Sequence, residues 1–494
     1  MQVPLADYPG FNRFVLDWLN GDERFLPRAS HPSPGTRASS TEREALANAI
    51  DQSNRHWGIF ASDALRKWAK GETATVIAGQ QVGFAGGPLY TLAKLVTLVK
   101  MKRELEAQGK PATAFFWLAT EDHDFEEVAT LNVPVKTGQL DLLCMRAVRT
   151  TESRAVVGPQ PIPETLINQL LALYDLDRPG WLREGITFRD SFAELIATLF
   201  GNEVILIDAL LPELRRAGEP LFRLIEANRD EIQRRLQERS QELEAAGYKE
   251  QVIAREGSEY TLLFELDAHG NRRKPGDHRQ PERTSTSALT RPLLQDAVLQ
   301  PDVFIGGPAE VAYYAQIAPL HELLGVPMPR IALRGHALVL PKRVARAFER
   351  YAIDPAEVFS SADRILAERE PEGVARIREL TEEGKRELMQ RIAAIGELAL
   401  PADHSLAGSI NRSIGHLEFH FNKLAERAIK GMVRKDRERL AATRELVATL
   451  YPDGHVQDRV VSWFAYWIEH GPHLVDRLLD ELEPDSPCFR IVEI

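Results

Sequence analysis

Residues 74–90 read ATVIAGQQVGFAGGPLY, an apolar, β-rich run followed by a loop that contains four glycines. The run from Ala74 to Ala78 has the length and composition of a buried strand. Residues 89–108 then read as a helix, and residues 112–119 as a second apolar strand. Strand, loop, helix and strand within about 45 residues is typical of a βαβ unit, in which strands buried on both faces do not alternate. The stretch predicts an α/β fold with a parallel sheet.

Three later segments fit the same sheet. Residues 189–200 read as a helix, while residues 203–208 and 303–305 are short apolar runs of strand length. We expect a core built on this parallel sheet to extend over residues 1–371. Residues near 130–185 and 211–300 mix helical stretches, strand fragments and turn-rich text, and we interpret them as insertions.

From about residue 372 the sequence becomes a charge-rich helical region. Two apolar stripes are separated by a short polar break at residues 401–404, which predicts an antiparallel coiled coil over residues 372–450. Such helices expose more apolar surface than a hairpin consumes, so we expect a homodimer. Residues 451–494 are expected to pack on the core, with a core helix at 461–468. One stripe contains Val374, Ile377, Leu388, Ile392, Ile395 and Leu398, and the other contains Leu406, Ile410, Ile414, Leu417, Phe421, Leu424 and Ala428.

Length and composition narrow the class of protein. A chain of 494 residues predicts about two to four folding units. Its formal charge of −11 disfavours nucleic acid and anionic membrane as partners. Cys144 and Cys488 lie far apart, which argues against a disulfide framework or a cysteine-rich zinc site. With no secretory signal and no apolar run of about 18 residues, we expect a cytoplasmic protein outside the membrane.

The glycine loop is the first candidate for ligand binding. Its glycines let the backbone approach a ligand, Pro88 suits the first position of the following helix, and the helix N-terminus offers amides to an anion. The spacing is neither G-x-G-x-x-G nor that of a P-loop, so a tight connection without a ligand is the alternative. The candidate residues here are Gly79, Gln80, Gln81, Gly83, Gly86, Gly87 and Tyr90.

An acidic loop follows the second strand directly. It reads Glu121-Asp122-His123-Asp124. Because the carboxyl ends of adjacent parallel strands meet at one edge, we expect Gln81 and His123 to share a pocket. Carboxylates beside a histidine bind Mg²⁺ or an ammonium group, or transfer protons. The alternative is a solvated loop in which an aspartate caps the next helix.

A third segment repeats the order of strand, turn and helix start. Its Gly306 and Gly307 form the turn, and Glu310 and Tyr313 follow on the predicted helix. Arg330 and Arg334 come next and are candidates for bidentate binding of phosphate or carboxylate, although a surface ion pair is the more common role of a single arginine. His416 and His420 have zinc-compatible spacing but flank the coiled-coil stripe without a third ligand, so no metal site is predicted.

Several motifs together resemble the bacillithiol biosynthesis cysteine-adding enzymes, a family of cysteine ligases. The resemblance implies a Rossmann-like core related to nucleotidyl transferases, connecting-peptide insertions and a coiled coil that pairs two subunits. It also implies the last step of bacillithiol synthesis, which joins cysteine to glucosaminyl malate. The chain departs from the family pattern at Gly86, where a threonine is usual. The motifs are Gly79-Gln80-Gln81 with Gly83, Gly87-Pro88-Leu89-Tyr90-Thr91, Glu121-Asp122-His123-Asp124, and Gly307-Pro308 with Glu310, Ala312 and Tyr313.

Amide formation adds a chemical requirement. A free carboxylate is a poor electrophile, so we expect ATP as the activating cofactor, with Mg²⁺ as a further candidate and phosphates at the glycine loop. Asp122, His123 and Asp124 are the expected catalytic residues. Two alternatives remain: an enzyme of this fold that activates a different acid, and a non-catalytic dimeric scaffold that binds a ligand.

Overall fold

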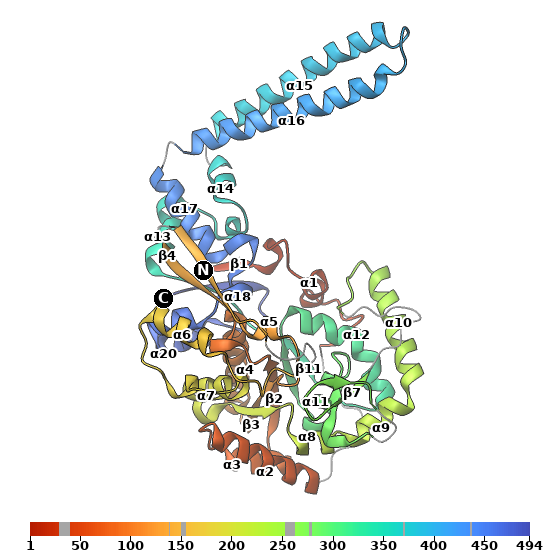
Figure 1. Cartoon of the computed structure of the whole chain (residues 1–494), viewed down its shortest axis with the longest axis vertical. Helices are drawn as coiled ribbons and strands as arrows, with labels where there is room; N and C mark the ends of the chain where they lie inside the picture. The colour runs from red at the N-terminus through yellow and green to blue at the C-terminus, as the bar shows by residue number, and fades with distance from the viewer. Residues whose placement is uncertain are drawn as a thin grey trace. The chain divides into compact units, whose positions relative to one another are not determined.

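The computed structural model contains two compact units (Figure 1). The core unit comprises residues 1–135, 142–339 and 456–494, and the helical unit comprises residues 136–141 and 340–455. No described helix is long and apolar enough to cross a membrane. The structure describes residues 1–28, 40–137, 139–149, 155–251, 262–275, 279–368, 371–434 and 437–494.

A five-stranded parallel sheet forms the centre of the core unit, which confirms the predicted fold class. The strand order is β11-β10-β2-β3-β6, and β2 pairs with β3 in a register that sets Gln80 opposite Leu118. The strand expected at 203–208 begins two residues later, and β11 had not been predicted. The strands are β2 (Ala74–Gln80), β3 (Ala112–Leu118), β6 (Ile205–Asp208), β10 (Val303–Gly306) and β11 (Arg330–Leu333).

Helices cover both faces of this sheet. Successive strand residues point to opposite faces, and on β3 the ring of Phe115 contacts Trp68 while the ring of Phe116 stacks on Phe192. Burial on both faces explains the unbroken apolar runs of the strands. The helices around the sheet are α2 (Ser40–His56), α3 (Ser62–Ala69), α4 (Leu89–Ala107), α7 (Phe188–Phe200) and α12 (Pro308–Leu324).

The C-terminal segment belongs to the core unit, where α18 (Gln457–Val460) and α20 (Pro472–Glu481) contact α4. The helix predicted at 461–468 begins only at Phe464 (α19, Phe464–His470). The preceding residues are extended instead, and Ser462 forms a β-bridge with Pro88. The last strand, β13 (Cys488–Glu493), lies between β1 (Gln2–Pro4) and β12 (His336–Leu340) in a small second sheet.

The predicted insertions contain secondary structure of their own. The described part of residues 130–185 forms a two-stranded sheet and an α-helix, and that of residues 211–300 forms three α-helices, a three-stranded sheet and a fourth α-helix. These elements are β4 (Thr130–Thr137), β5 (Gln139–Arg146), α6 (Glu164–Tyr174), α8 (Pro212–Ala217), α9 (Glu219–Ala227), α10 (Arg229–Ala245), β7 (Leu263–Leu266), β8 (Arg272–Arg273), β9 (Thr284–Thr286) and α11 (Arg291–Leu299).

The helical unit begins at residue 340, earlier than the predicted boundary at 372. Before the long helices it contains α13 (Lys342–Tyr351) and α14 (Ala362–Glu368), and after them α17 (Arg437–Leu450). The long helices α15 (Pro371–Ala399) and α16 (Leu406–Val433) lie side by side as an antiparallel pair (Figure 1).

The two predicted stripes match the seam of this helix pair only in part. Phe421 packs over Gly384, and Gly396 faces Ile410. Gly396 occupies the seam of α15, and its neighbour Ile395 is exposed. Near the end of α16, the residues of the seam follow Phe421 at intervals of four. The predicted stripe continues instead through Leu424 and Ala428, so the two diverge. The predicted seam residues that are exposed instead are Ile395, Leu398, Leu406, Leu424 and Ala428.

Candidate active site

A cavity of about 430 Å³ opens where β2, β3 and β10 reach their carboxyl ends. This is the position at which open α/β sheets bind ligands, and we call it the sheet-edge cavity. Its lining combines residues of the three predicted loops with residues of the insertion between β6 and β10. The lining residues are Gly79, Gln80, Gln81, Trp117, Ala119, Glu121, Asp122, His123, Gln251, Arg272, Thr286, Ser287, Ala288, Arg291, Ala309, Glu310 and Tyr313.

The structure brings the glycine loop and the acidic loop together, as their positions after adjacent strands predict. Gln81 and His123 line the same cavity. The side-chain amide of Gln81 donates a hydrogen bond of 2.7 Å to Oδ2 of Asp122. The first loop therefore fixes a carboxylate of the second.

Asp122 is held as an anion at this edge. Its Oδ1 accepts the backbone N–H of His123 at 2.7 Å and lies 3.5 Å from Nδ1 of the same residue. Burial alone would raise the pKa of Asp122, but hydrogen bonds from His123 and Gln81 outweigh it and hold the pKa well below its usual range. A fixed anion beside an exposed imidazole favours one orientation of His123.

Asp124 has a different position. Its carboxylate accepts the backbone N–H of Glu127 at 3.1 Å and caps the short helix α5 (Phe125–Val128). Its side chain is exposed, and the residue is not part of the cavity lining. This position favours the capping alternative for Asp124.

Glu121 is buried and already bonded. Its carboxylate accepts hydrogen bonds from Ser285 at 2.6 Å and Thr286 at 3.2 Å, and Arg215 lies 3.3 Å away. The first two residues belong to β9 of the insertion. Glu121 thus connects the loop after β3 to the insertion that closes the cavity.

A buried lysine that the sequence analysis missed connects the first and third loops. Nζ of Lys94 lies 2.5 Å from Oε2 of Glu310 and donates to the Gly79 carbonyl at 2.9 Å and to Oε1 of Gln80 at 2.8 Å. Burial lowers the pKa of Lys94, and the Glu310 carboxylate opposes this. Lys94 was missed because it sits in the apolar run of α4, where only the position of α12 reveals its partner.

The turn before α12 supports this contact. The Gly307 amide donates to Oε2 of Glu310 at 2.7 Å, so the carboxylate caps its own helix while it binds Lys94. Glu310 and Tyr313 line the cavity, whereas Gly306 and Gly307 lie behind them. The predicted role of these two glycines as ligand-binding residues is replaced by that of a turn that places Glu310.

The second half of the glycine loop does not reach the cavity, contrary to our prediction. The Leu89 amide, at the N-terminus of α4, donates to the Val461 carbonyl at 2.8 Å. Trp463 donates from Nε1 to the Gly86 carbonyl at 3.0 Å, and a Cβ at Gly86 would lie 2.1 Å from its ring. The helix end predicted to bind phosphate is thus covered by the C-terminal segment. The predicted ligand-binding residues outside the cavity lining are Gly83, Gly86, Gly87 and Tyr90.

The two predicted arginines are committed elsewhere. Arg330 begins β11, at the amino end of the sheet, and pairs with Asp485 at 2.8 Å. Arg334 follows β11 at the correct edge but is buried, pairs with Asp458 at 2.7 Å and stacks over the ring of Tyr90. Neither residue lines the sheet-edge cavity.

Two other arginines, Arg272 and Arg291, line the cavity and were not predicted. Arg272 donates to the Thr286 carbonyl at 2.8 Å and lies 3.9 Å from Glu121. Both arginines lie in the insertion between β6 and β10. Their local sequence gives no sign that this insertion reaches the edge of the sheet, so they were not predicted. Among the described residues, no group of three potential ligands for a metal ion was found.

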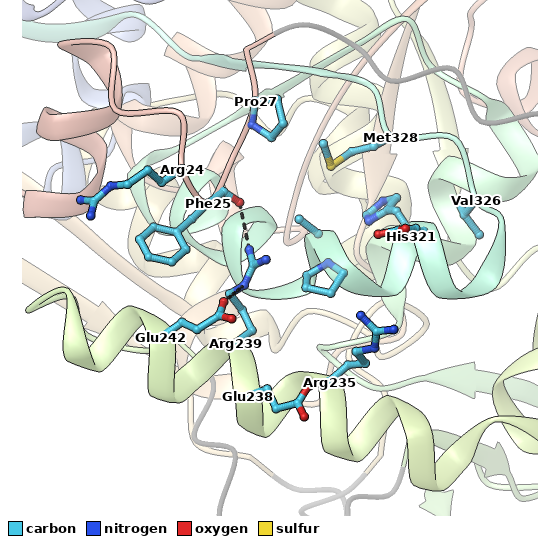
Figure 2. A pocket seen from close by; sticks show the side chains of 13 residues that line it. Arg24, Phe25, Pro27, Arg235, Glu238, Arg239, Glu242, His321, Val326 and Met328 are labelled. Atoms are coloured by element: carbon cyan, nitrogen blue, oxygen red, sulfur yellow. Dashed lines mark hydrogen bonds and ion pairs between the residues drawn. The ribbon is translucent and has the colours of Figure 1, made fainter.

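A second cavity of about 470 Å³ lies between α10, α12 and the segment around Phe25 (Figure 2). We call it the α10–α12 cavity. Arg239 extends from α10 and donates hydrogen bonds to the carbonyls of Phe25 at 3.1 Å and Ala315 at 3.0 Å. Pro319 has no N–H for the Ala315 carbonyl four residues earlier, so Arg239 satisfies an acceptor that the helix leaves open. Arg239 has a structural role here.

Comparison with known proteins gives one consistent family. The model for the bacillithiol biosynthesis BshC N-terminal Rossmann-like domain matches residues 21–274 and 277–335, and the BshC C-terminal coiled-coil domain matches residues 337–494. The chain is also similar to proteins named "Putative cysteine ligase BshC". It is 30% identical to the one from Koribacter versatilis, over 100% of this chain and 99% of the relative. It is 27% identical to the one from Staphylococcus carnosus, over 83% and 82%.

Proposed function

Because the chain belongs to the bacillithiol biosynthesis BshC family, we propose that it is a cysteine ligase that joins the carboxyl group of cysteine to the amine of glucosaminyl malate. The observation that carries the proposal is the sheet-edge cavity, in which motifs about 40 and 230 residues apart in sequence converge on one space. Gln81, His123 and Glu310 come from those three motifs.

The residues of the cavity suit the amine half of the reaction. An ammonium group must lose a proton before its nitrogen can attack a carbonyl carbon. His123 is exposed to the cavity and oriented by Asp122, so it is our candidate for the proton acceptor. The ionised Asp122 would also stabilise the imidazolium that results. Asp122 and His123 thus remain the proposed catalytic residues, without Asp124.

We propose ATP as the activating cofactor of the reaction, because the carboxylate must first carry a leaving group that an amine can displace. When bound, the nucleotide would supply that activation of the cysteine carboxylate. The covered N-terminus of α4 does not fit phosphates. The cations that line the sheet-edge cavity, Arg272 and Arg291, fit an anionic group of a substrate.

We further propose that the protein is a cytoplasmic homodimer, with the α15–α16 pair as the contact between copies. Cytoplasm is where ATP and thiol-bearing cysteine are both available. Large apolar side chains concentrate on the outer faces of these helices, and exposed patches of this kind are typical of protein interfaces. They are Leu380, Met389, Ile395, Leu398, Leu406, Phe419 and Leu424.

A ligation assay tests the proposed function. Purified protein is incubated with cysteine, glucosaminyl malate and ATP, and the amide product is measured by mass spectrometry while each component is omitted in turn. We expect product only in the complete mixture, and a loss of about 10²-fold or more in His123→Ala. His416→Ala, which changes an exposed histidine on α16, is the control and should retain full turnover.

Each outcome of the assay has a distinct meaning. Product without ATP would contradict the proposed cofactor but not the ligase. No product, with binding of glucosaminyl malate retained, would favour the scaffold alternative. Turnover of a different acid in place of cysteine would favour the alternative of an enzyme that activates a different acid.

A further inference from the structure

Arg291 is the starting point because none of the ion pairs among the described residues uses its charge. It is the first residue of α11, is half-buried and lines the sheet-edge cavity. The one described hydrogen bond of its side chain, from Nη1 to Oε1 of Gln295, is long at 3.5 Å. The ion pairs of the described residues do not include Arg291.

The arginines of the α10–α12 cavity provide an internal comparison (Figure 2). Arg24 pairs with Asp22 at 2.6 Å, Arg235 with Glu231 at 2.9 Å and Arg239 with Glu242 at 2.9 Å. Each of these side chains has a carboxylate partner beside that cavity, whereas Arg291 has none in the described chain. A half-buried cation without a partner is costly unless a ligand supplies the anion.

Two neutral groups of the same cavity also have no partner. The Tyr313 hydroxyl and Oε1 of Gln81 are buried and make no hydrogen bond in the described structure. Burial raises the pKa of Tyr313, and the charge of Arg291 opposes part of this rise, so the hydroxyl stays protonated as a donor. A buried polar group without a partner costs about 1–3 kcal/mol. The cavity therefore presents a cation, a donor and an acceptor for a ligand.

We propose that Arg291 and Tyr313 bind a carboxylate of the malate group of glucosaminyl malate, and that Gln81 accepts a hydrogen bond from its sugar. The inference rests on the proposed function, and it deepens that function by assigning the residues that select the acceptor substrate. A guanidinium and a hydroxyl supply the donors that a carboxylate accepts, and the planar fork of arginine matches its two oxygens.

Charge balance favours this carboxylate over the phosphates of a nucleotide. The two cavity arginines face three carboxylates of the lining, which are Glu121, Asp122 and Glu310. A polyphosphate would bring far more negative charge to this acidic lining than two arginines offset.

The test separates the three substrates. We expect Arg291→Gln to raise the KM for glucosaminyl malate by about tenfold or more, the scale of a lost charged hydrogen bond, while the KM values for cysteine and ATP change less than about twofold. Arg291→Lys should restore part of the affinity because it keeps the charge. Tyr313→Phe should give a smaller rise in the same KM.

A direct measurement of binding makes the test independent of turnover. Calorimetric titration with glucosaminyl malate alone should show binding to the wild type and weaker binding to Arg291→Gln, even if no ligation is detected. Arg273→Gln is the matched control, because Arg273 neighbours Arg272 on β8, pairs with Asp267 and has 65% of its side chain exposed. Equal affinity of wild type and Arg291→Gln, no binding to the wild type, or a rise only in the KM for ATP would overturn the inference.

Discussion

Asp122 and Asp124 lie two residues apart in one loop, but their carboxylates have different partners. Oδ2 of Asp122 accepts from Gln81 across the cavity edge, whereas Asp124 accepts from the backbone of its own helix. The sequence could not distinguish these roles, since either aspartate is a good helix cap. The distinction depends on where the loop after β2 places Gln81.

The first prediction concerns Asp124. Asp124→Ala should lower the free energy of unfolding by about 1 kcal/mol, because the cap of α5 is lost, and turnover per folded molecule should stay near normal. Asp124→Asn, which retains a capping oxygen, should behave like the wild type in both respects. Denaturant unfolding and ligation rates on the same samples provide the measurement. A loss of turnover in both variants at normal stability would restore Asp124 to the catalytic residues.

The second prediction concerns pH. The folded-state pKa of Asp122 is depressed, so its stabilising contribution is present above the unfolded pKa of about 3.9 and is lost as pH falls through the folded value. The difference in unfolding free energy between wild type and Asp122→Asn should therefore be largest near neutral pH and shrink below about pH 4. Urea unfolding at several pH values measures it. A difference that stays constant down to pH 3 would contradict this account of Asp122.

At the scale of elements, the sequence predicted β2, α4 and β3 nearly to the residue, because apolar runs and glycine punctuation are local signals. What covers the glycine loop was not predictable. Val461 and Trp463 contact the loop from more than 370 residues away in sequence, and Trp463 belonged to a run that reads as helix. Backbone pairing between Ser462 and Pro88 overrides that local preference.

The third prediction compares two glycines that flank α4. Gly86 and Gly109 have similar backbone angles, with φ of +84° and +77°, but only Gly86 lies against a side chain, that of Trp463. Gly109→Ala should cost about 1 kcal/mol for backbone strain. Gly86→Ala should cost at least about 1 kcal/mol more because the methyl group overlaps the indole. Equal losses in thermal or denaturant unfolding would show that Trp463 does not constrain this position.

At the scale of the whole molecule, the order of the motifs predicted both the fold class and the edge of the sheet where the sheet-edge cavity lies. Long-range partners account for what was missed. The role of Lys94 depends on its ion pair with Glu310. The role of Arg291 depends on the insertion that places it at the edge of the sheet. Arg330 lies away from the sheet-edge cavity because an unpredicted strand begins there, which places it at the opposite edge of the sheet.

The fourth prediction tests the proposed dimer. Leu398→Glu and Phe419→Glu change side chains that are 84% and 58% exposed on the α15–α16 pair, so each should reduce the solution mass to that of one chain while helix content is preserved. Phe421→Glu should instead disturb the pair itself, because Phe421 packs on Gly384. Phe60→Glu, at a 61% exposed residue of the core unit, is the control. Light scattering gives the mass and circular dichroism the helix content, and an unmodified protein of single-chain mass would contradict the proposal.

A crystal structure of the protein with glucosaminyl malate tests the central claim most directly. The account predicts density for the ligand in the sheet-edge cavity, with its amine toward His123 and a carboxylate on Arg291. Density in the α10–α12 cavity instead, or a ligand in the sheet-edge cavity that contacts neither His123 nor Arg291, would contradict it.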